Sequence, residues 1–250
     1  MFLTWDIISR YFRIGVYQME DFSLIILCRG QKHLLPATLE NLKSQKGSFE
    51  ILLLDAEGSS MLKEIVDHYP DLKITTRNTK GHNLAEMMNE GLGLAKGKYI
   101  QFLEPGDRYI SQHGLEFLST LIANEPHLVY ANSLNRGTIS SADFISTRSP
   151  WFLKSKLFEL GGFDKGLTEC PAMDLLCRLF HDKKTQSVYC RRVLIDSDHH
   201  RTVPIKESCR ILYRHFGFFH TLKWVFLQDR SQLFRRTTAF LKEAFWKSDQ

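Results

Sequence analysis

Hydrophobic and polar positions follow two alternating periods through the first hundred residues of the chain. Four short apolar runs bounded by turn residues predict buried strands, at residues 22–28, 49–54, 72–76 and 98–103. Between these runs, apolar residues recur every three or four positions, which predicts helices at residues 34–42, 60–68 and 83–95. Strands that alternate with helices of this length form βαβ units, so we expect an α/β fold with a mainly parallel sheet flanked by helices.

The second half of the chain is less regular. Its pattern predicts helices at residues 115–123, 151–160 and 175–180, and strands at residues 127–131 and 186–195. From Pro204 onward, aromatic and basic residues at helical spacing predict amphipathic helices. We therefore expect an N-terminal helical extension at residues 1–21, an α/β domain at residues 22–203, and a basic, aromatic helical segment at residues 204–250.

The excess positive charge of the chain lies in that last segment. The 250 residues carry a formal net charge of +5, and residues 209–250 hold eight basic and three acidic side chains, which account for all of it, together with ten aromatic ones. Such a segment can lie on an anionic membrane surface, or it can pack on the domain or on a second subunit. No nucleic-acid-binding module is recognised, so nucleic acid is not an expected partner.

Length, cysteine content and the size of the apolar runs limit the class of protein. A chain of this length buries enough apolar surface to fold without disulfides, and its five cysteines, with no CxxC pair, are typical of free thiols in a reducing compartment. The apolar runs are far shorter than the roughly 18 to 20 residues that span a membrane, and residues 1–17 lack the pattern of a secretory signal. We expect a cytoplasmic protein, peripheral at the inner membrane face if its basic segment binds lipid.

Candidate chemistry gathers where the first, second and fourth strands end. These ends are Cys28 to Gly30, Asp55 to Ser59 and Glu104 to Asp107, and two of the three carry carboxylates. Ligands of open α/β sheets bind at the carboxyl ends of the strands. We therefore expect a binding site at this edge of the sheet.

Five segments in this order resemble motifs of family 2 glycosyltransferases, which have the GT-A fold. They are residues 23–45, residues 50–59, residues 81–103 leading into the acids of residues 104–107, residues 152–164, and residues 174–178. The resemblance covers residues 22–200. It implies a GT-A domain that transfers a sugar from a nucleotide-diphosphate donor to a glycan or lipid-linked acceptor.

The resemblance also implies roles for individual residues. The nucleotide-sugar ligands that it implies are Leu27, Arg29, Asp55, Asn89 and Glu104. A Mg²⁺ or Mn²⁺ ion, which neutralises charge on the leaving diphosphate, would be held by Glu104 and Asp107 together with His200 or His199. The general base that removes the acceptor proton would be Glu169 or Asp174.

The sequence departs from the family pattern at three places. Ala56 stands where the family has the second of two acids, and Gly106 interrupts the acidic metal motif. Pro171 and Ala172 stand where the family has an acidic pair that includes the base. An inactive GT-A protein that only binds its ligands is therefore the alternative to an active transferase. A nucleotidyltransferase with a similar sheet is disfavoured by the segment Gly161 to Asp164.

Overall fold

One mixed sheet organises the chain in the computed structural model, which describes residues 22–58, 60–135, 138–140, 150–197 and 204–227. The strand order is β3-β2-β1-β4-β8-β6-β9-β5, with β7 paired to β6. The strands are β1 (Phe22–Cys28), β2 (Glu50–Asp55), β3 (Ile74–Asn78), β4 (Tyr99–Leu103), β5 (Asp107–Tyr109), β6 (Leu128–Asn135), β7 (Thr138–Ser140), β8 (Trp151–Leu153) and β9 (Ser187–Ser197). Strands β3, β2, β1 and β4 run parallel, and β8 pairs antiparallel with both β4 and β6.

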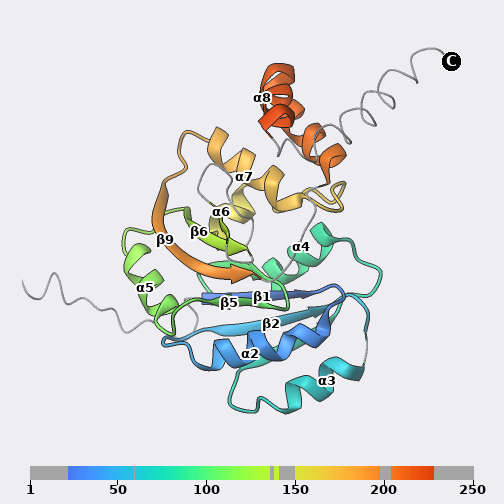
Figure 1. The fold of residues 1–250 in the computed structure, drawn as a ribbon, viewed down its shortest axis with the longest axis vertical. Coiled ribbons are helices and arrows are strands. Elements are labelled where there is room, and N and C mark those ends of the chain that lie inside the picture. Colours follow the sequence, from blue (N-terminus) through green and yellow to red (C-terminus); the bar gives the residue numbers. More distant parts are fainter. Residues whose placement is uncertain (1–21, 59, 136–137, 141–149, 198–203, 228–250) are drawn as a thin grey trace, which may run out of the picture.

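Helices cover both faces of this sheet. They are the short 3-10 helix η1 (Lys32–Leu34) and the α-helices α2 (Leu35–Lys43), α3 (Ser60–Asp67), α4 (Leu84–Leu94), α5 (Gly114–Leu121), α6 (Lys154–Glu159), α7 (Pro171–His181) and α8 (Ile205–Leu227). Figure 1 shows the sheet between α2 and α3 on one side and α7 on the other. Apolar side chains of α2, α3 and α5 share one buried cluster, and those of α4, α6 and α7 share the other. The prediction of a mainly parallel α/β sheet flanked by helices is confirmed.

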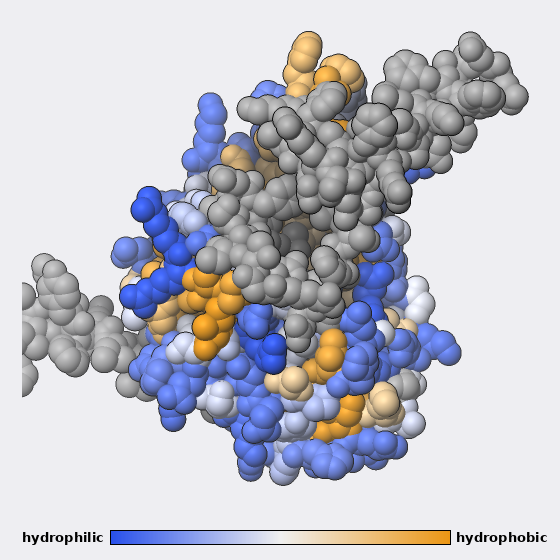
Figure 2. Space-filling view, viewed as in Figure 1, coloured by the Kyte–Doolittle hydropathy of each residue, from blue (hydrophilic) through white to orange (hydrophobic). Residues whose placement is uncertain are grey.

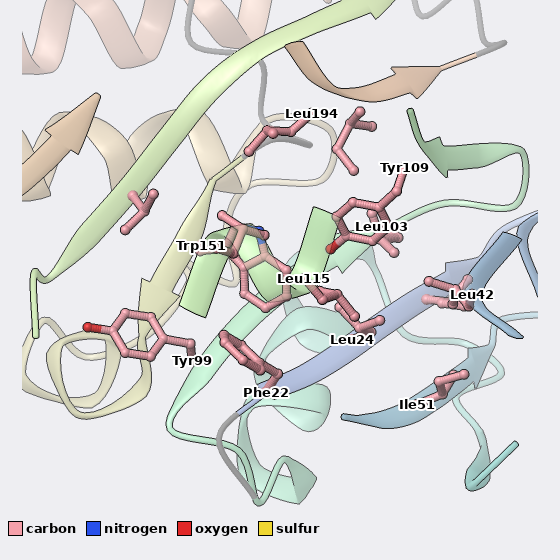
Figure 3. Close-up of a cluster of buried hydrophobic side chains, with 14 of the residues drawn as sticks. Phe22, Leu24, Leu42, Ile51, Tyr99, Leu103, Tyr109, Leu115, Trp151 and Leu194 are labelled. Carbon is pink, nitrogen blue, oxygen red and sulfur yellow. The ribbon is translucent and has the colours of Figure 1, made fainter. Parts of the chain in front are cut away.

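The alternation of side chains along β1 divides the hydrophobic core in two. Leu24 faces the cluster that contains α2, and the next residue, Ile25, faces the cluster that contains α4. In the first cluster, the ring of Trp151 lies edge-on to that of Phe22, with their centroids 5.2 Å apart (Figure 3). Because both faces of β1 are buried, its sequence is apolar except for Ser23, as expected for a central parallel strand.

Two helices begin elsewhere than predicted. The expected helix at residues 151–160 is wrong in its first turn, because Trp151–Leu153 forms β8 and α6 begins at Lys154. These three residues are buried, and β8 pairs with β4 on one side and β6 on the other, so tertiary pairing overrides the local helical pattern. Helix α7 begins at Pro171 instead of residue 175, since proline is well accommodated in the first turn of a helix.

Helix α8 packs on α7 rather than on the sheet. Ile211 of α8 shares a small buried cluster with Cys177 of α7 and Leu167 of the preceding loop. The helix is kinked at Gly217, which has φ 74° and ψ −176°. No helix in the described part of the chain is long and apolar enough to cross a membrane. The predicted extension at residues 1–21 and the end of the basic segment lie outside the described residues.

Candidate functional site

The predicted site is an edge of the sheet where three parallel strands end side by side. Cys28, the last residue of β1, pairs with Asp55, the last residue of β2, and β4 lies against the other side of β1. The turns that follow these strands contain Arg29, residues 56–58 and residues 104–107. The topology therefore brings the three strand ends together as the sequence predicts.

A buried lysine neutralises the carboxylate at the end of β2. The Nζ atom of Lys32 lies 2.6 Å from Oδ1 of Asp55 and 3.2 Å from Oε2 of Glu57. Burial by itself would lower the pKa of Lys32, but hydrogen bonds to Asp55 and Glu57 outweigh it and raise the pKa. Lys32 is therefore charged at neutral pH, and Asp55 is part of an internal ion pair. This role of Lys32 was not predictable, since nothing in its spacing along the chain places it beside Asp55.

The turn after β4 is held in shape by its own acid. Asp107 Oδ2 accepts a hydrogen bond from the backbone N–H of Glu104 at 2.8 Å, and Oδ1 accepts one from the Ser197 hydroxyl at 2.7 Å. Gly106 has φ 99°, a left-handed conformation that favours glycine, and its N–H donates to the Thr38 hydroxyl at 2.7 Å. The glycine that interrupts the family's acidic motif is therefore required by this turn.

The described residues at this turn do not by themselves supply a full set of ligands for a divalent cation. Mg²⁺ needs a near-octahedral set of oxygen ligands, and Mn²⁺ also favours oxygen. The Asp107 side chain is only 1% exposed, with both oxygens accepting hydrogen bonds within the protein. The described residues contain no group of three or more His, Cys, Asp or Glu side chains placed to hold a metal. His199 and His200 lie outside the described residues, so their predicted role is untested.

One ion pair crosses from the strand ends to the loop that precedes α7. Nη2 of Arg29 lies 3.6 Å from Oε1 of Glu169, and the two side chains are 29% and 48% exposed. The Nη1 atom of Arg29 is buried and has no hydrogen-bond partner in the described part of the protein. One of the five predicted nucleotide-sugar ligands, Arg29, and one of the two predicted bases, Glu169, thus lie together.

The other predicted base, Asp174, is engaged inside the protein. It is buried in the first turns of α7, where Oδ2 accepts from Nε of Arg178 and Oδ1 accepts from Nε2 of His215, both at 2.8 Å. Arg178 also donates to the backbone carbonyls of Leu160 and Gly162, both at 2.7 Å. Asp174 therefore links α7 with α8 and, through Arg178, with the turn at Gly161 and Gly162, called the glycine turn below. Both of its oxygens are buried and hydrogen-bonded inside the protein.

Two further predicted ligands have structural contacts. The side-chain amide of Asn89 donates to the carbonyl of Phe163 at 2.8 Å and accepts from its N–H at 2.9 Å, which ties α4 to the glycine turn. Leu27 is buried in the core on the α4 side of the sheet. Their predicted contact with a nucleotide sugar is untested. No disulfide joins any of the five cysteines, all of which lie in the described residues.

A glutamate outside the predicted site contacts the loop that carries Glu169. The Glu207 carboxylate, in the first turn of α8, accepts hydrogen bonds from the backbone N–H groups of Thr168, Glu169 and Cys170. Sequence reasoning missed Glu207. An acid near the start of a helix is common because it complements the helix dipole, so its spacing carried no sign of this contact.

Comparison with known proteins gives a match to one protein family and to several solved structures. The model of the family described as Glycosyl transferase family 2 matches residues 23–187, more than half of the chain. A search of curated proteins gives no match.

Similar solved structures include the S. aureus TarS 1-349 structure with UDP, at a TM-score of 0.63 and 13% identity, covering 85% of this chain and 76% of that chain. TarS 1-349 with UDP-GlcNAc has a TM-score of 0.65 at 13% identity, covering 78% and 65%. The mannosyltransferase PcManGT from Pyrobaculum calidifontis, in complex with GDP-Man and Mn²⁺, has a TM-score of 0.61 at 14% identity, covering 81% and 64%. At these identities the likeness is one of fold.

Proposed function

Because the chain belongs to glycosyl transferase family 2, we propose that it transfers a sugar from a nucleotide-diphosphate donor to a glycan or lipid-linked acceptor. The observation that carries this proposal is the pair formed by Arg29 and Glu169 at 3.6 Å. It places a partly exposed cation and a partly exposed carboxylate together at the edge of the sheet where α/β folds bind ligands. Glycosyl transfer from such a donor needs both charges.

Arg29 is the group that we assign to the donor diphosphate. A guanidinium binds phosphate oxygens with paired hydrogen bonds, and Nη1 of Arg29 has no hydrogen-bond partner in the described structure. TarS structures contain UDP and UDP-GlcNAc, and the PcManGT structure contains GDP-Man, which supports the donor class. We do not assign to Asp55 a contact with the nucleobase of the donor. Lys32 and Glu57 already surround that carboxylate, and the next residue is Ala56, which has no polar side chain.

Glu169 is the group that we assign as general base, in preference to Asp174. In a single displacement, the acceptor oxygen attacks the anomeric carbon while the bond from that carbon to the diphosphate oxygen breaks. The electron pair leaves with the nucleoside diphosphate, and the acceptor proton passes to the Glu169 carboxylate. Glu169 is half exposed, whereas both oxygens of Asp174 are buried and hydrogen-bonded, so only Glu169 can be reached by an acceptor.

A divalent cofactor remains a prediction for this chain. The Mn²⁺ in the PcManGT structure supports it. The burial of Asp107 is an argument against this residue as a metal ligand. We derive no step through a metal, and we assign the charge of the leaving diphosphate to Arg29.

We propose that the acceptor is reached at an anionic membrane surface through the far half of α8. Tyr213, Phe218 and Phe219 are exposed on this helix, Phe219 by 81%, and Figure 2 shows hydrophobic atoms at the top of the molecule, where α8 lies in Figure 1. Exposed aromatic rings on a basic helix fit the interface of an anionic bilayer, and α8 also carries the half-exposed Arg210 and Arg214, which lie on the side of the loop before α7.

Vesicle sedimentation tests this membrane proposal. The full chain should sediment with vesicles of phosphatidylcholine and phosphatidylglycerol and less with phosphatidylcholine alone. Replacing Phe218 and Phe219 by Ser should abolish the binding. Phe158→Ser is the matched control, because Phe158 is 54% exposed on α6. Equal sedimentation of all three proteins would show that α8 is a packing element only.

The alternative function is donor binding without transfer. Pro171 and Ala172 begin α7, with Ala172 buried in the core, so no acid occupies the positions where the family has its acidic pair. A protein of this kind would bind a nucleotide sugar and release no product. It differs from the proposed transferase only in the role of Glu169.

Calorimetric titration with a panel of nucleoside diphosphates and nucleotide sugars tests the donor site. We expect at least one of them to bind, and Arg29→Ala to weaken it by about tenfold or more, since a hydrogen bond to a charged group contributes about 1.5 to 3 kcal/mol. Arg191→Ala is the matched control, because Arg191 is an exposed residue on β9.

Three outcomes of this titration decide the assignments. If no nucleotide binds to the wild type, the donor proposal is wrong. Binding that persists in a chelator supports Arg29 as the diphosphate ligand, whereas binding that requires Mn²⁺ would assign that charge to a metal.

A further inference from the structure

The loop that carries Glu169 is held in place by a residue from beyond the family domain. Glu207 Oε1 accepts the N–H of Thr168 at 2.9 Å, and Oε2 accepts the N–H groups of Glu169 at 2.8 Å and Cys170 at 2.6 Å. The Glu207 side chain is 12% exposed. Residue 207 follows the family match, which ends at residue 187. One carboxylate from α8 thus fixes three consecutive backbone groups of the loop before α7.

Such an arrangement is strong and directional. Hydrogen bonds from backbone N–H groups to an ionised carboxylate are among the stronger ones in proteins. Successive N–H groups that converge before a helix form a concave site for an anion, and α7 adds the positive end of its dipole. Here the anion is the carboxylate of Glu207. The backbone of Glu169 is therefore fixed at the point where its side chain starts toward Arg29.

Other contacts of α8 hold the two ends of the same loop. Before the loop, Arg214 Nη1 lies 3.0 Å from Oδ2 of Asp164. After it, His215 donates to Asp174 at 2.8 Å. In the region between these contacts, the Cys170 thiol lies 3.6 Å from the Ser208 hydroxyl. The whole stretch from residue 164 to residue 174 is thus anchored on one side by α8.

We propose that Glu207 is a positioning residue of the transfer site, which acts by holding Glu169 against Arg29. This inference rests on the proposed function, in which the donor diphosphate binds Arg29. The carboxylate of Glu169 and the diphosphate then compete for one guanidinium. Donor binding displaces Glu169 from Arg29 and leaves its carboxylate available to the acceptor hydroxyl, so α8 sets both the affinity for the donor and the position of the base.

The competition predicts how two substitutions change the affinity for an anionic ligand. Glu169→Gln removes the charge that competes with the diphosphate, so binding of an anionic ligand should tighten. The expected gain is about 1.5- to fivefold, the range that measured energies of exposed ion pairs correspond to. Glu207→Gln replaces one acceptor oxygen by a donor amide that faces N–H groups, so the loop loosens. Glu207→Gln should therefore also tighten binding of the anionic ligand, by no more than Glu169→Gln does.

A double-mutant cycle tests the proposal, with inorganic pyrophosphate and UDP as calorimetric probes of the full chain. Because Glu207 acts through Glu169, the double variant should bind both probes as Glu169→Gln alone does. Glu125→Gln is the control. It removes the same charge from an exposed glutamate that pairs with Lys98, which precedes β4 at the end of the strand opposite the site. The affinity for both probes should not change. Thermal melting checks that each variant is folded.

Hydrogen exchange gives a second reading that does not depend on ligand binding. Glu207→Gln should raise the amide exchange rates of Thr168, Glu169 and Cys170, and Glu125→Gln should leave them unchanged. Unchanged exchange in Glu207→Gln would overturn the proposal. So would gains in affinity that add in the double variant, because Glu207 would then act independently of Glu169. If the wild type binds neither probe, the donor site itself is wrong and the proposal fails with it.

Discussion

Replacing Asp174 by Asn separates the two carboxylates that the family resemblance offers as a base. Asn has nearly the same shape, but it offers one acceptor oxygen and one donor amide where Asp174 offers two acceptor oxygens. In the protein those oxygens accept from Nε of Arg178 and Nε2 of His215, each at 2.8 Å. The amide then faces Nε2 of His215, which must give up its proton to accept from it, and the Arg178 guanidinium is left beside a neutral group in place of a carboxylate.

The magnitude follows from these contacts. A hydrogen bond to a charged group contributes about 1.5 to 3 kcal/mol, and a buried group left without its partner adds a desolvation cost, so we expect the free energy of unfolding to fall by about 2 to 4 kcal/mol. For a chain of this size, this corresponds to a melting temperature lower by about 4 to 15 °C. Urea denaturation monitored by circular dichroism measures the change in midpoint, with the slope of the transition as a check on two-state behaviour.

The matched control for this prediction is Glu169→Gln. The Arg29–Glu169 pair is partly exposed and 3.6 Å long, so its loss should change the free energy of unfolding by about 1 kcal/mol or less. An Asp174→Asn variant with wild-type stability and no transfer activity would refute the reasoning, because Asp174 would then act on the substrate and not on the fold.

Three other substitutions or conditions test the site and the loops around it. Lys32→Met leaves Asp55 buried without its cation and should lower the free energy of unfolding by about 3 to 5 kcal/mol, measured by urea denaturation. Gly106→Asp, which restores an acid to the turn after β4, should cost about 1 to 3 kcal/mol in the same assay because residue 106 has φ 99°. The N–H of Gly166 and the Arg214 guanidinium lower the pKa of Asp164. Its ionised form therefore stabilises the fold above its ordinary pKa of about 3.9, and this contribution is lost as the pH falls through the lowered value. Comparison of urea midpoints of wild type and Asp164→Asn at neutral and acidic pH should show the difference shrinking in acid.

The elements whose patterns are local were predictable from the sequence. The limits of β1 coincide with its apolar run, and the helix predicted from residue 83 begins there, with Asn83 as its N-cap, since Asn83 Oδ1 accepts the N–H of Glu86 at 2.9 Å. β8 was not predictable in this way, because Trp151–Leu153 becomes a strand only through pairing with β4 and β6. Its side chains carry no alternation that distinguishes a strand buried on both faces from a helix.

The same distinction applies to the site. The strand ends that carry Arg29 and Asp55 were predictable, since a parallel sheet brings them to one edge. The contacts that define their chemistry join segments far apart in the sequence. Arg29 meets Glu169, and Glu207 reaches back to the loop before α7. These pairings depend on tertiary packing, which no spacing of residues encodes.

Product release from nucleotide sugars is the measurement that tests the central claim most directly. The full chain is incubated with the nucleotide sugar that binds best, with water alone or with added glycans as the sugar acceptor. The release of nucleoside diphosphate is then followed. Loss of a general base lowers rates by about 10²- to 10⁴-fold. We therefore predict that the wild type releases product and that Glu169→Gln reduces the rate to this extent while donor affinity is retained or tighter. Equal rates in the two proteins, or no release by the wild type in the presence of bound donor, would contradict the assignment of Glu169 as the base.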